Sequence, residues 1–480
     1  MVVVETPSLV RQPNVLLINC DDLGYGDVGC YGCTVNETPV LDRLAGEGLR
    51  FTDFYMASPV CSPSRAALLT GCYPPRIGFG EFDGFPVLFP GHRFGLHPDE
   101  VTIARLLAEV GYATKAVGKW HCGDQAPFLP TRHGFDSWYG IPYSNDMGRQ
   151  AHAEGAVPIR ELLAQFDLQL PVDEFPPLPL VLDDEVLEAQ PDQASLTARF
   201  VDEAIRFMRH QRAGPWFLYL AHIYVHIPLY VPEHFMRVSG NGRYGGAVAA
   251  IDWATGMLLA ELERLALDAD TVVIFTSDNG SRARGEGGSN HPLRGTKGST
   301  WEGGMRVPCI IRWPQRIEAG RVTSALTTAM DLYPTIAAIA GATVPSDRVI
   351  DGRDITPVLL HDDAASPHDA FSYYRADHLE AVRAGPWKLH LARHGAAVDE
   401  LYNLDDDIGE TTNRFADEPA VVARLTAHAD TMRGELGDAR LGVVGTGRRP
   451  RGEVDNPTTL TTFDPTHPYF MAEYDLTDRG

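Results

Sequence analysis

The sequence predicts an α/β fold with a mixed, mostly parallel sheet flanked by helices, followed by a smaller α+β region. One observation is the continuous apolar run from Asn14 to Asn19, which is typical of a central strand buried on both faces. Another is the alternation of strand-like and helix-like segments after it, which favours a parallel sheet with helices on both sides. The third is a change near Ser366, where short β-like runs replace this alternation.

Apolar periodicity assigns the alternating segments in chain order. Helices are expected at Val101–Val110, Leu196–Arg212 and Tyr244–Leu265, and further strands at Ala113–Val117, Trp216–Ala221 and Thr271–Thr276. Polar residues follow the strands, and the carboxyl ends of parallel strands meet at one edge of a sheet. The residues expected to converge at that edge are Asp21, Asp22, Lys119, His121, His226, Asp278 and Asn279.

The chain divides into two expected domains, residues 1–365 and residues 366–480. Within the first, residues 150–193 are rich in Pro, Leu and acids without a clear period, which predicts an insertion near the site. Within the second, short strands are expected around Ala381–Leu391 and Glu400–Leu404, and a helix near Pro419–Leu436. The tail after Gly437 has little periodicity and is expected to wrap the protein surface or an oligomer partner.

The charge balance argues against two classes of partner. With 41 basic and 64 acidic residues the formal net charge is −23, so nucleic acid and anionic membrane surfaces would be repelled. No apolar run approaches the length that spans a membrane. Met1 to Pro13 lacks the basic start, long apolar stretch and cleavage site of a signal peptide, so we expect a cytoplasmic protein.

Cysteine usage agrees with a reducing compartment. Seven cysteines are an odd number spread thinly through a long chain, which is not a disulfide framework. Cys30 and Cys33 form a C-x-x-C pair, but no second pair or histidine lies at zinc-finger spacing.

Two acidic motifs follow apolar strands. Asp21 and Asp22 come directly after the first strand, and Asp278 and Asn279 follow the strand at 271–276. Neighbouring carboxylates repel one another unless a cation lies between them, and hard oxygen ligands select Ca²⁺ or Mg²⁺. Each motif alone would read as a turn or a helix cap, but both together, each after a strand, favour a metal site.

The segment from Cys61 to Gly71, Cys-Ser-Pro-Ser-Arg-Ala-Ala-Leu-Leu-Thr-Gly, is the most specific motif in the chain. Alone, it would suit a buried cysteine at a proline-containing helix start equally well. Its C-x-P-S-R pattern, followed by Leu-Thr-Gly, resembles the signature of the type I, formylglycine-dependent sulfatase family. The acidic motifs also resemble that family, and the likeness runs from about Asn14 to Asn413, nearest to the arylsulfatase A type.

The resemblance implies an alkaline-phosphatase-like fold and oxidation of Cys61 to formylglycine by a formylglycine-generating enzyme. It also implies one divalent cation, Ca²⁺ ahead of Mg²⁺. The implied metal ligands are Asp21, Asp22, residue 61, Asp278 and Asn279.

Further motifs resemble the family's catalytic and substrate-binding segments. Alone, Lys119 would suit an exposed lysine, and His121 or His226 a hydrogen-bonded histidine. The residues with an implied catalytic role are Cys61, Arg65, Lys119, His121, His226 and Lys297, and those implied to bind substrate are Ser144, Lys119, His226 and Lys297. Lys119 and His121 are expected to face one pocket because alternate residues of an extended chain point to the same side. His222 is expected to be a core or supporting residue instead.

The expected activity is hydrolysis of an aryl or sugar sulfate by a hydrated aldehyde at position 61. Two rivals remain: a phosphonate monoester or phosphodiester hydrolase of the same superfamily, and a binding protein that kept the fold. A two-zinc phosphatase is disfavoured because no histidine cluster accompanies the aspartates. The alcohol half of the substrate is not specified, although the acidic surface disfavours a long polyanion. A homo-oligomer is a guess from size.

Overall fold

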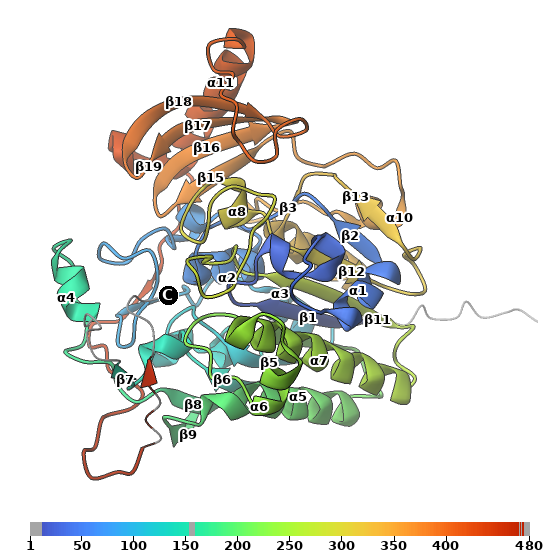
Figure 1. Cartoon of the computed structure of the whole chain (residues 1–480), viewed down its shortest axis with the longest axis vertical. Helices are drawn as coiled ribbons and strands as arrows, with labels where there is room; N and C mark the ends of the chain where they lie inside the picture. The colour runs from blue at the N-terminus through green and yellow to red at the C-terminus, as the bar shows by residue number, and fades with distance from the viewer. Residues whose placement is uncertain (1–11, 153–158, 470, 472, 475–480) are drawn as a thin grey trace, which may run out of the picture.

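The computed structural model describes residues 12–152, 159–469, 471, 473 and 474. Its centre is a mixed sheet of ten strands, of which the five in the middle run parallel (Figure 1). In spatial order the strands are β13 (Arg321–Thr323), β2 (Leu49–Phe51), β12 (Cys309–Arg312), β11 (Thr271–Ser277), β1 (Asn14–Cys20), β10 (Trp216–Ala221), β5 (Ala113–Lys119), β6 (Ser137–Ile141), β8 (Pro179–Leu182) and β9 (Glu185–Ala189).

Strand β1 shows why the centre of the sheet is apolar. All seven of its residues are buried, with Leu16 and Ile18 in one hydrophobic core and Val15 and Leu17 in another. Successive side chains of a strand point to opposite faces, so a strand covered on both sides must be apolar throughout. The continuous apolar run in the sequence is therefore explained by helices on both faces.

The two cores are covered by different helices. One core includes side chains of α5 (Gln193–His210) and α7 (Gly242–Arg264). The other includes side chains of α2 (Cys61–Thr70), α3 (Ile103–Glu109) and α9 (Leu332–Ala340). The predicted α/β class is confirmed.

Shorter elements complete the chain. The short helices are α1 (Pro39–Gly46), α4 (Ile159–Ala164), α6 (Glu233–Val238), α8 (Glu302–Met305) and α10 (Thr356–Leu360). Four two-stranded pairs join β14 (Thr327–Thr328) to β3 (Phe54–Tyr55), β19 (Gly437–Asp438) to β20 (Val443–Val444), β21 (Gly452–Glu453) to β4 (Phe94–Gly95) and β22 (Glu473–Tyr474) to β7 (Ala151–His152).

The expected segments all occur, with ends shifted by a few residues, but the sequence reasoning missed several strands. The segment 150–193 is more than a loop, because β8 and β9 extend the main sheet in antiparallel order beyond β6. Its short strands lack an apolar alternation: β9 is mostly exposed at the edge of the sheet. Pairing with a distant strand, which has no local signature, places them there.

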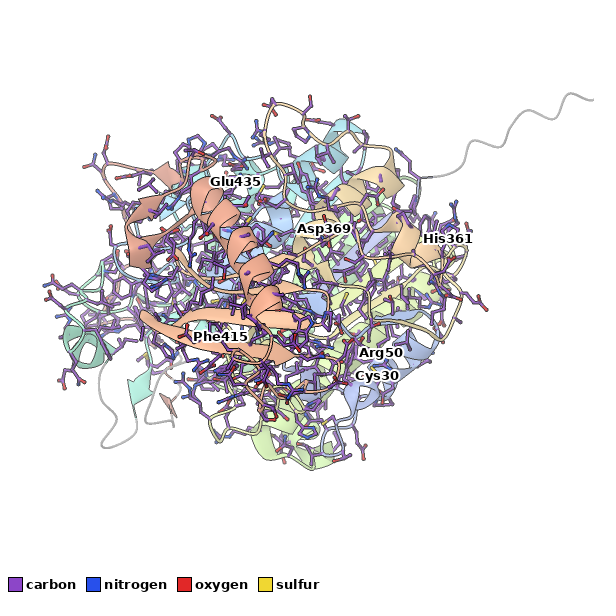
Figure 2. All side chains as sticks on the ribbon, turned by 90° about the horizontal axis from the view of Figure 1, so that it is seen from above. Cys30, Arg50, His361, Asp369, Phe415 and Glu435 are labelled. Atoms are coloured by element: carbon purple, nitrogen blue, oxygen red, sulfur yellow. The ribbon has the colours of Figure 1, made fainter. Side chains whose placement is uncertain are left out.

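The C-terminal region forms a separate antiparallel sheet of four strands, at the top of Figure 1. These are β15 (Phe371–Arg375), β16 (His378–Ala384), β17 (Trp387–Arg393) and β18 (Ala396–Asn403). Helix α11 (Pro419–Leu436) lies across the sheet, with Glu435 near one end in Figure 2. The core under α11 also includes Tyr55 and Ala67 of the main region, so the two regions pack together.

The tail after Gly437 returns to the main region. Strand β21 pairs with β4, and Thr461 donates a hydrogen bond to the carbonyl of Pro177. The described part of the tail therefore packs on its own chain. In the described part of the chain, no helix is long and apolar enough to cross a membrane. The expectation about a signal peptide concerns a segment whose first 11 residues lie outside the described ones.

Gly118 provides a test of how tightly β5 and β10 pack. Its φ is +100°, and an added Cβ would lie 1.8 Å from the carbonyl oxygen of Ala221. We expect Gly118→Ala to lower the free energy of unfolding by about 3 kcal/mol or more, because strain and a backbone clash add. Denaturant unfolding measures this loss.

Gly111 is the matched control. Its φ is +91°, but no atom lies within 4 Å of an added Cβ, so Gly111→Ala carries the backbone strain without the clash. We expect it to cost about 1–2 kcal/mol. Equal losses for the two variants would contradict a tight contact between β5 and β10.

Candidate active site

The candidate site lies at the carboxyl edge of the parallel strands. Asp21 and Asp22 follow β1 directly, and Asp278 and Asn279 follow β11. Strands β1 and β11 are hydrogen-bonded neighbours, with Asn19 opposite Thr276 and Cys20 opposite Ser277. The two acidic motifs therefore meet because their strands pair in register.

Three carboxylates form a buried cluster. Oxygen atoms of Asp21, Asp22 and Asp278 lie within 4.8 Å of one another. Asn279 Nδ2 donates to Asp22 Oδ1 at 2.7 Å. Neither Asn279 Oδ1 nor Asp21 Oδ1 accepts a hydrogen bond from the described residues. Buried oxygen atoms without a donor are costly unless a cation binds them. The set fits a hard divalent cation.

The pKa of Asp278 reflects this crowding. Burial raises the pKa to about 7, Arg65 opposes the rise, and the carboxylate of Asp21 adds to it. A bound cation would oppose this shift, because its positive charge favours the ionised form of the carboxyl.

Each carboxylate also has a basic partner. Arg65 Nε lies 2.7 Å from Asp278 Oδ2, and Lys119 Nζ lies 2.7 Å from Asp21 Oδ2. Lys297 Nζ lies 3.0 Å from Asp22 Oδ2. Burial lowers the pKa of Lys119, but Asp21 more than compensates, so its pKa is raised and the ammonium stays charged. The site holds fixed positive charge within a strongly acidic protein.

Cys61 is the first residue of α2 and is buried. Burial raises the pKa of its thiol, although Lys119 and Lys297 pull it down. The group is therefore a neutral thiol, which is a weak nucleophile. The N-terminus of a helix and two lysines around it instead favour binding of an anion.

Ser144 and His226 lie beside this cluster. Lys119 Nζ donates to Ser144 Oγ at 3.2 Å, so the lysine bridges Ser144 and Asp21. His226 Nε2 is 3.9 Å from Asp22 Oδ2, and its Nδ1 lies 2.5 Å from the carbonyl oxygen of Ile227. His222 is fully buried, and neither of its ring nitrogens has a hydrogen-bond partner among the described residues.

The sequence predicts that Lys119 and His121 face one pocket because side chains alternate along a strand. The structure does not support that reasoning. Strand β5 ends at Lys119, and His121 has a left-handed backbone with φ +61°, so the alternation of a strand does not set its direction. His121 Nε2 instead lies 2.9 Å from the carbonyl oxygen of Leu88. Burial, followed by the charge of Lys119, holds the pKa of His121 well below its ordinary value, so the ring is neutral.

Sequence reasoning missed the side chains that hold the acidic loops. Ser64 Oγ donates to the carbonyl of Asp278 at 2.5 Å, and Ser277 Oγ donates to the carbonyl of Asn279 at 3.0 Å. Ser64 belongs to the Cys61 motif, so its position was a usable signal. Ser277 had no signal beyond its place at the end of a strand.

The loop that carries Lys297 joins three parts of the site. The backbone N–H of Lys297 donates to Ser281 at 3.0 Å, next to the second acidic motif. The N–H of Gly298 donates to Pro59 at 2.9 Å, two residues before Cys61. From the C-terminal sheet, Arg375 Nε donates to the carbonyl of Gly298 at 2.9 Å.

A second buried set of charges anchors the far end of this loop. Lys388 of β17 donates to Thr300 O at 2.8 Å and lies 2.9 Å from Glu302 Oε1 and 3.0 Å from Glu410 Oε1. The three charged side chains are fully buried. An ammonium shared by two carboxylates satisfies charges that would be very costly alone. The C-terminal sheet therefore helps to build the site.

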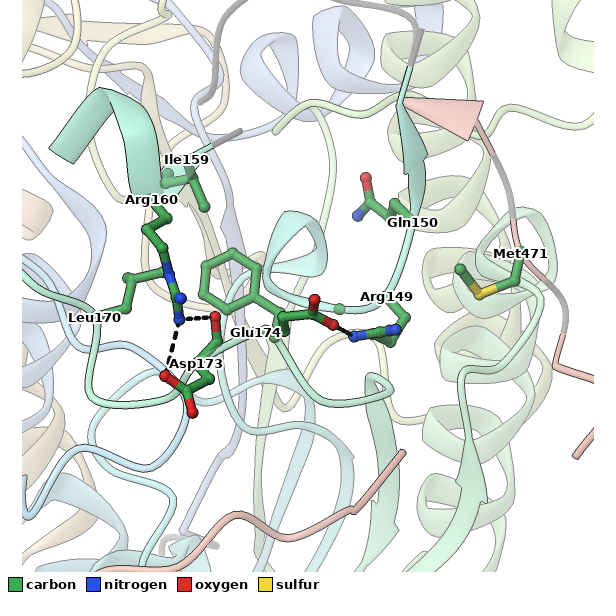
Figure 3. Close-up of a pocket in the computed structure, with 10 residues that line it drawn as sticks. Arg149, Gln150, Ile159, Arg160, Leu170, Asp173, Glu174 and Met471 are labelled. Atoms are coloured by element: carbon green, nitrogen blue, oxygen red, sulfur yellow. Dashed lines mark hydrogen bonds and ion pairs between the residues drawn. The ribbon is translucent and has the colours of Figure 1, made fainter. Parts of the chain in front are cut away.

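A pocket of about 380 Å³ opens beside the 150–193 segment. Its lining includes Gly148 and Arg149, which follow Ser144 closely, and Phe175 from the 150–193 segment. Figure 3 shows Arg149 paired with Glu174, and Arg160 paired with Asp173. Phe175 stacks on Phe89. Phe89 directly follows Leu88, whose carbonyl contacts His121. The pocket thus combines apolar and paired charged groups, and one of its lining residues packs on the residue after Leu88.

A parallel sheet that gathers carboxylates and buried cations at one edge is the architecture of a metal-assisted hydrolase of anionic esters. The model of the Sulfatase family matches residues 13–342. A second model, N-sulphoglucosamine sulphohydrolase, C-terminal, matches residues 296–434. The chain belongs to the sulfatase family and is a sulfuric ester hydrolase, as the sequence predicted.

Several relatives are similar over most of the chain. The steryl-sulfatase of Mus musculus is 41% identical over 430 residues, covering 78% of this chain and 69% of the relative. The N-acetylgalactosamine-6-sulfatase of Canis lupus familiaris is 42% identical over 391 residues, covering 79% and 72%. Arylsulfatase A of Homo sapiens is 39% identical over 435 residues, covering 87% and 82%.

Solved structures agree with this assignment. The structure of Ps i-CgsB in complex with k-i-k-neocarrahexaose has a TM-score of 0.75 and 32% identity, covering 88% of this chain and 92% of that one. The phosphonate monoester hydrolase of Agrobacterium radiobacter has a TM-score of 0.58 and 22% identity, covering 88% and 95%. The latter likeness is one of fold alone.

The buried carboxylate cluster predicts how the stability of the metal-free protein depends on pH, and how a bound cation changes that stability. In chelator-treated protein the pKa of Asp278 rises from 3.8 to about 7 on folding, so the folded state binds the proton more tightly. Its contribution makes the free energy of unfolding fall as pH rises across that interval. We expect Ca²⁺ at pH 7.5 to restore about 2.7 kcal/mol at a hundredfold excess over Kd.

The control for this measurement is Asp278→Asn, which keeps the shape and removes the titration. Thermal unfolding with and without Ca²⁺ should show a smaller loss of stability with pH and a smaller gain from Ca²⁺ in the variant. The same response to Ca²⁺ in both proteins would place the ion elsewhere.

Lys388→Met is expected to destabilise the protein strongly. The change leaves Glu302 and Glu410 buried without their shared cation, which costs about 3–5 kcal/mol. Denaturant unfolding measures it. Arg237→Ala is the comparison, because it breaks an exposed i,i+4 pair with Glu233 that is worth about 0–1 kcal/mol. Similar losses would mean that the buried charges are accessible to water.

Proposed function

We propose that the chain hydrolyses sulfate monoesters with residue 61 as formylglycine and with one divalent cation, Ca²⁺ ahead of Mg²⁺. The observation that supports this best is the setting of Cys61. A buried, neutral thiol is a poor nucleophile, yet it begins a helix and lies in the field of Lys119 and Lys297. Oxidation to an aldehyde would place a reactive group where an anion binds.

The cation would be held by Asp21, Asp22, Asp278, Asn279 and residue 61. When bound, it would neutralise the carboxylates and polarise oxygen atoms of the sulfate group. The Oδ1 atoms of Asp21 and Asn279 accept no hydrogen bond from the described residues, which supports this ligand set. A formylglycine-generating enzyme is then a required partner, and a homo-oligomer and a cytoplasmic setting stay predictions.

The basic side chains have distinct roles in the proposal. Hydration of the aldehyde gives residue 61 two hydroxyl groups, of which one attacks sulfur after losing its proton with help from Asp278. Lys119, Lys297 and His226 bind the sulfuryl oxygens, and His226 or Lys297 protonates the departing alcohol. Arg65, bonded to Asp278, keeps the charge at residue 61 balanced.

His121 would act in the second half of the reaction. The C–O bond between residue 61 and sulfate breaks as the remaining hydroxyl gives up its proton, which releases sulfate and restores the aldehyde. A neutral imidazole is able to take that proton, and the low pKa of His121 keeps the ring neutral.

We infer that the alcohol half of the substrate extends toward the pocket beside the 150–193 segment, whose lining residue Phe175 stacks on Phe89. Its volume of about 380 Å³ and its mixture of apolar and paired charged groups suit a sugar or an aryl group. The k-i-k-neocarrahexaose in complex with Ps i-CgsB, and the N-acetylgalactosamine in the name of a relative, support a carbohydrate sulfate. The phosphonate alternative has support from fold likeness alone.

The proposal is tested at Cys61 by peptide mass spectrometry on protein produced with a formylglycine-generating enzyme. We expect a mass loss of about 18 Da, as a thiol becomes an aldehyde, together with turnover of 4-nitrophenyl sulfate. Catalytic efficiency on this ester should exceed that on phosphate diesters and phosphonate esters.

Cys61→Ser is the matched variant, because a serine sulfate lacks the second hydroxyl that expels the sulfate. It should release at most one equivalent of 4-nitrophenol per protein molecule. Sustained turnover by the variant, or by protein with an unmodified thiol, would sink the proposed mechanism.

A further inference from the structure

We propose that the tail segment Arg451–Thr461 positions His121 by holding the loop Phe85–Leu96, here called the supporting loop, against the active site. Both regions are remote in sequence. The kinetic consequence of this proposal rests on the function proposed above, while its structural part does not.

The inner side of the supporting loop contacts the site directly. The carbonyl of Leu88 lies 2.9 Å from His121 Nε2, and the N–H of Leu88 donates to Ser62 Oγ at 3.0 Å, next to residue 61. The N–H of Leu96 donates to the carbonyl of Cys122 at 2.8 Å. The loop therefore touches the segments on both sides of the reacting centre.

The contact with Leu88 selects a tautomer of His121. A carbonyl oxygen can only accept a hydrogen bond, so Nε2 must carry the proton. In the neutral ring Nδ1 then has the free lone pair, and it has no hydrogen-bond partner in the part of the chain that the structure describes. Leu88 thus leaves Nδ1 free to act as a base.

The outer side of the loop is held by the tail through Gln125. The N–H of Thr458 donates to Gln125 Oε1 at 2.9 Å, and Gln125 Nε2 donates back to the carbonyl of Thr458 at 2.9 Å. Gln125 Nε2 also donates to Asp124 Oδ1 at 2.6 Å, and Asp124 Oδ2 accepts from the N–H of Gly91 at 2.7 Å. This chain of bonds leads from the tail to the supporting loop.

Three further contacts hold the end of the loop. Strand β21 of the tail pairs with β4 at Phe94 and Gly95, and the N–H of Val454 donates to the carbonyl of Arg93 at 2.9 Å. The guanidinium of Arg451 lies 3.6 Å from the centre of the Phe94 ring. Apart from the two residues of β4, the loop contains no helix or strand, so its position depends on these partners.

The tail lies outside both family models, which end at residues 342 and 434. Without it, the carbonyl of Leu88 can leave Nε2, and His121 can take the other tautomer. The groups that bind sulfate, Lys119 and Lys297, are fixed by different contacts. Loss of the tail contact should slow sulfate release and leave substrate binding unchanged.

Two variants of the full-length, matured protein, Thr458→Pro and Thr458→Ala, distinguish the contribution of the Thr458 backbone from that of its side chain. Thr458 is exposed, and only its backbone atoms contact Gln125, so Pro removes the N–H donor and Ala keeps it. We expect Thr458→Pro to lower kcat about fivefold, the effect of one hydrogen bond. Because only the step after formation of the sulfate intermediate slows, KM for 4-nitrophenyl sulfate should fall by the same factor and kcat/KM should stay unchanged. The rapid release of the first equivalent of 4-nitrophenol should persist, and Thr458→Ala should match the parent protein.

Hydrogen exchange gives a second readout that needs no activity. Amides of residues 85–96 should exchange faster in Thr458→Pro than in Thr458→Ala, whether or not the protein turns over. If the parent protein lacks formylglycine and turnover, the proposed function fails, while this comparison still decides whether the tail holds the loop.

Gln125→Ala breaks the same pair from the other side. Gln125→Ala removes the bonds to Asp124 and to Thr458, so its loss of kcat should be at least that of Thr458→Pro. Adding Thr458→Pro to Gln125→Ala should then lower kcat no further, because the contact between the tail and Gln125 is already lost. Additive losses, or equal kcat and equal exchange for Thr458→Pro and Thr458→Ala in an active protein, would overturn the proposal.

Discussion

Mutual neutralisation of buried charges is the constraint on which the rest of this structure depends. Asp21, Asp22 and Asp278 are held out of water, and each is paired with Lys119, Lys297 or Arg65. Carboxylates this close repel one another, and the low dielectric around them strengthens both repulsion and attraction. The arrangement is stable only if every element that supplies a charge stays in place.

That requirement explains why distant parts of the chain converge. Parallel pairing of β1 with β11 brings the two acidic motifs together, and α2 places Arg65 and residue 61 beside them. Lys297 comes from a loop anchored by the C-terminal sheet through Arg375 and Lys388. The smaller sheet is therefore part of the catalytic architecture, although it contributes no group that touches the proposed substrate.

The site is supported more by loops than by regular elements. His121, Leu88 and Ser144 lie in segments whose backbone follows no repeating pattern, and each is fixed by a specific hydrogen bond. Such segments are held in place by the structures that cover them, here the tail and the 150–193 segment. The same two segments supply lining residues of the pocket, among them Phe175 and Met471, so parts outside the main sheet also shape it.

The sequence by itself determined the α/β class, the strands that precede the two acidic motifs, and the family. These features are local, because an apolar run buried on both faces and a motif of fixed spacing are visible without partners. Only the tertiary structure decided the left-handed turn at His121, the pairing of β8 and β9 with the sheet, the Lys388 cluster and the course of the tail. Each of these depends on contact between residues far apart in the chain, and no local pattern records which distant group a side chain will meet.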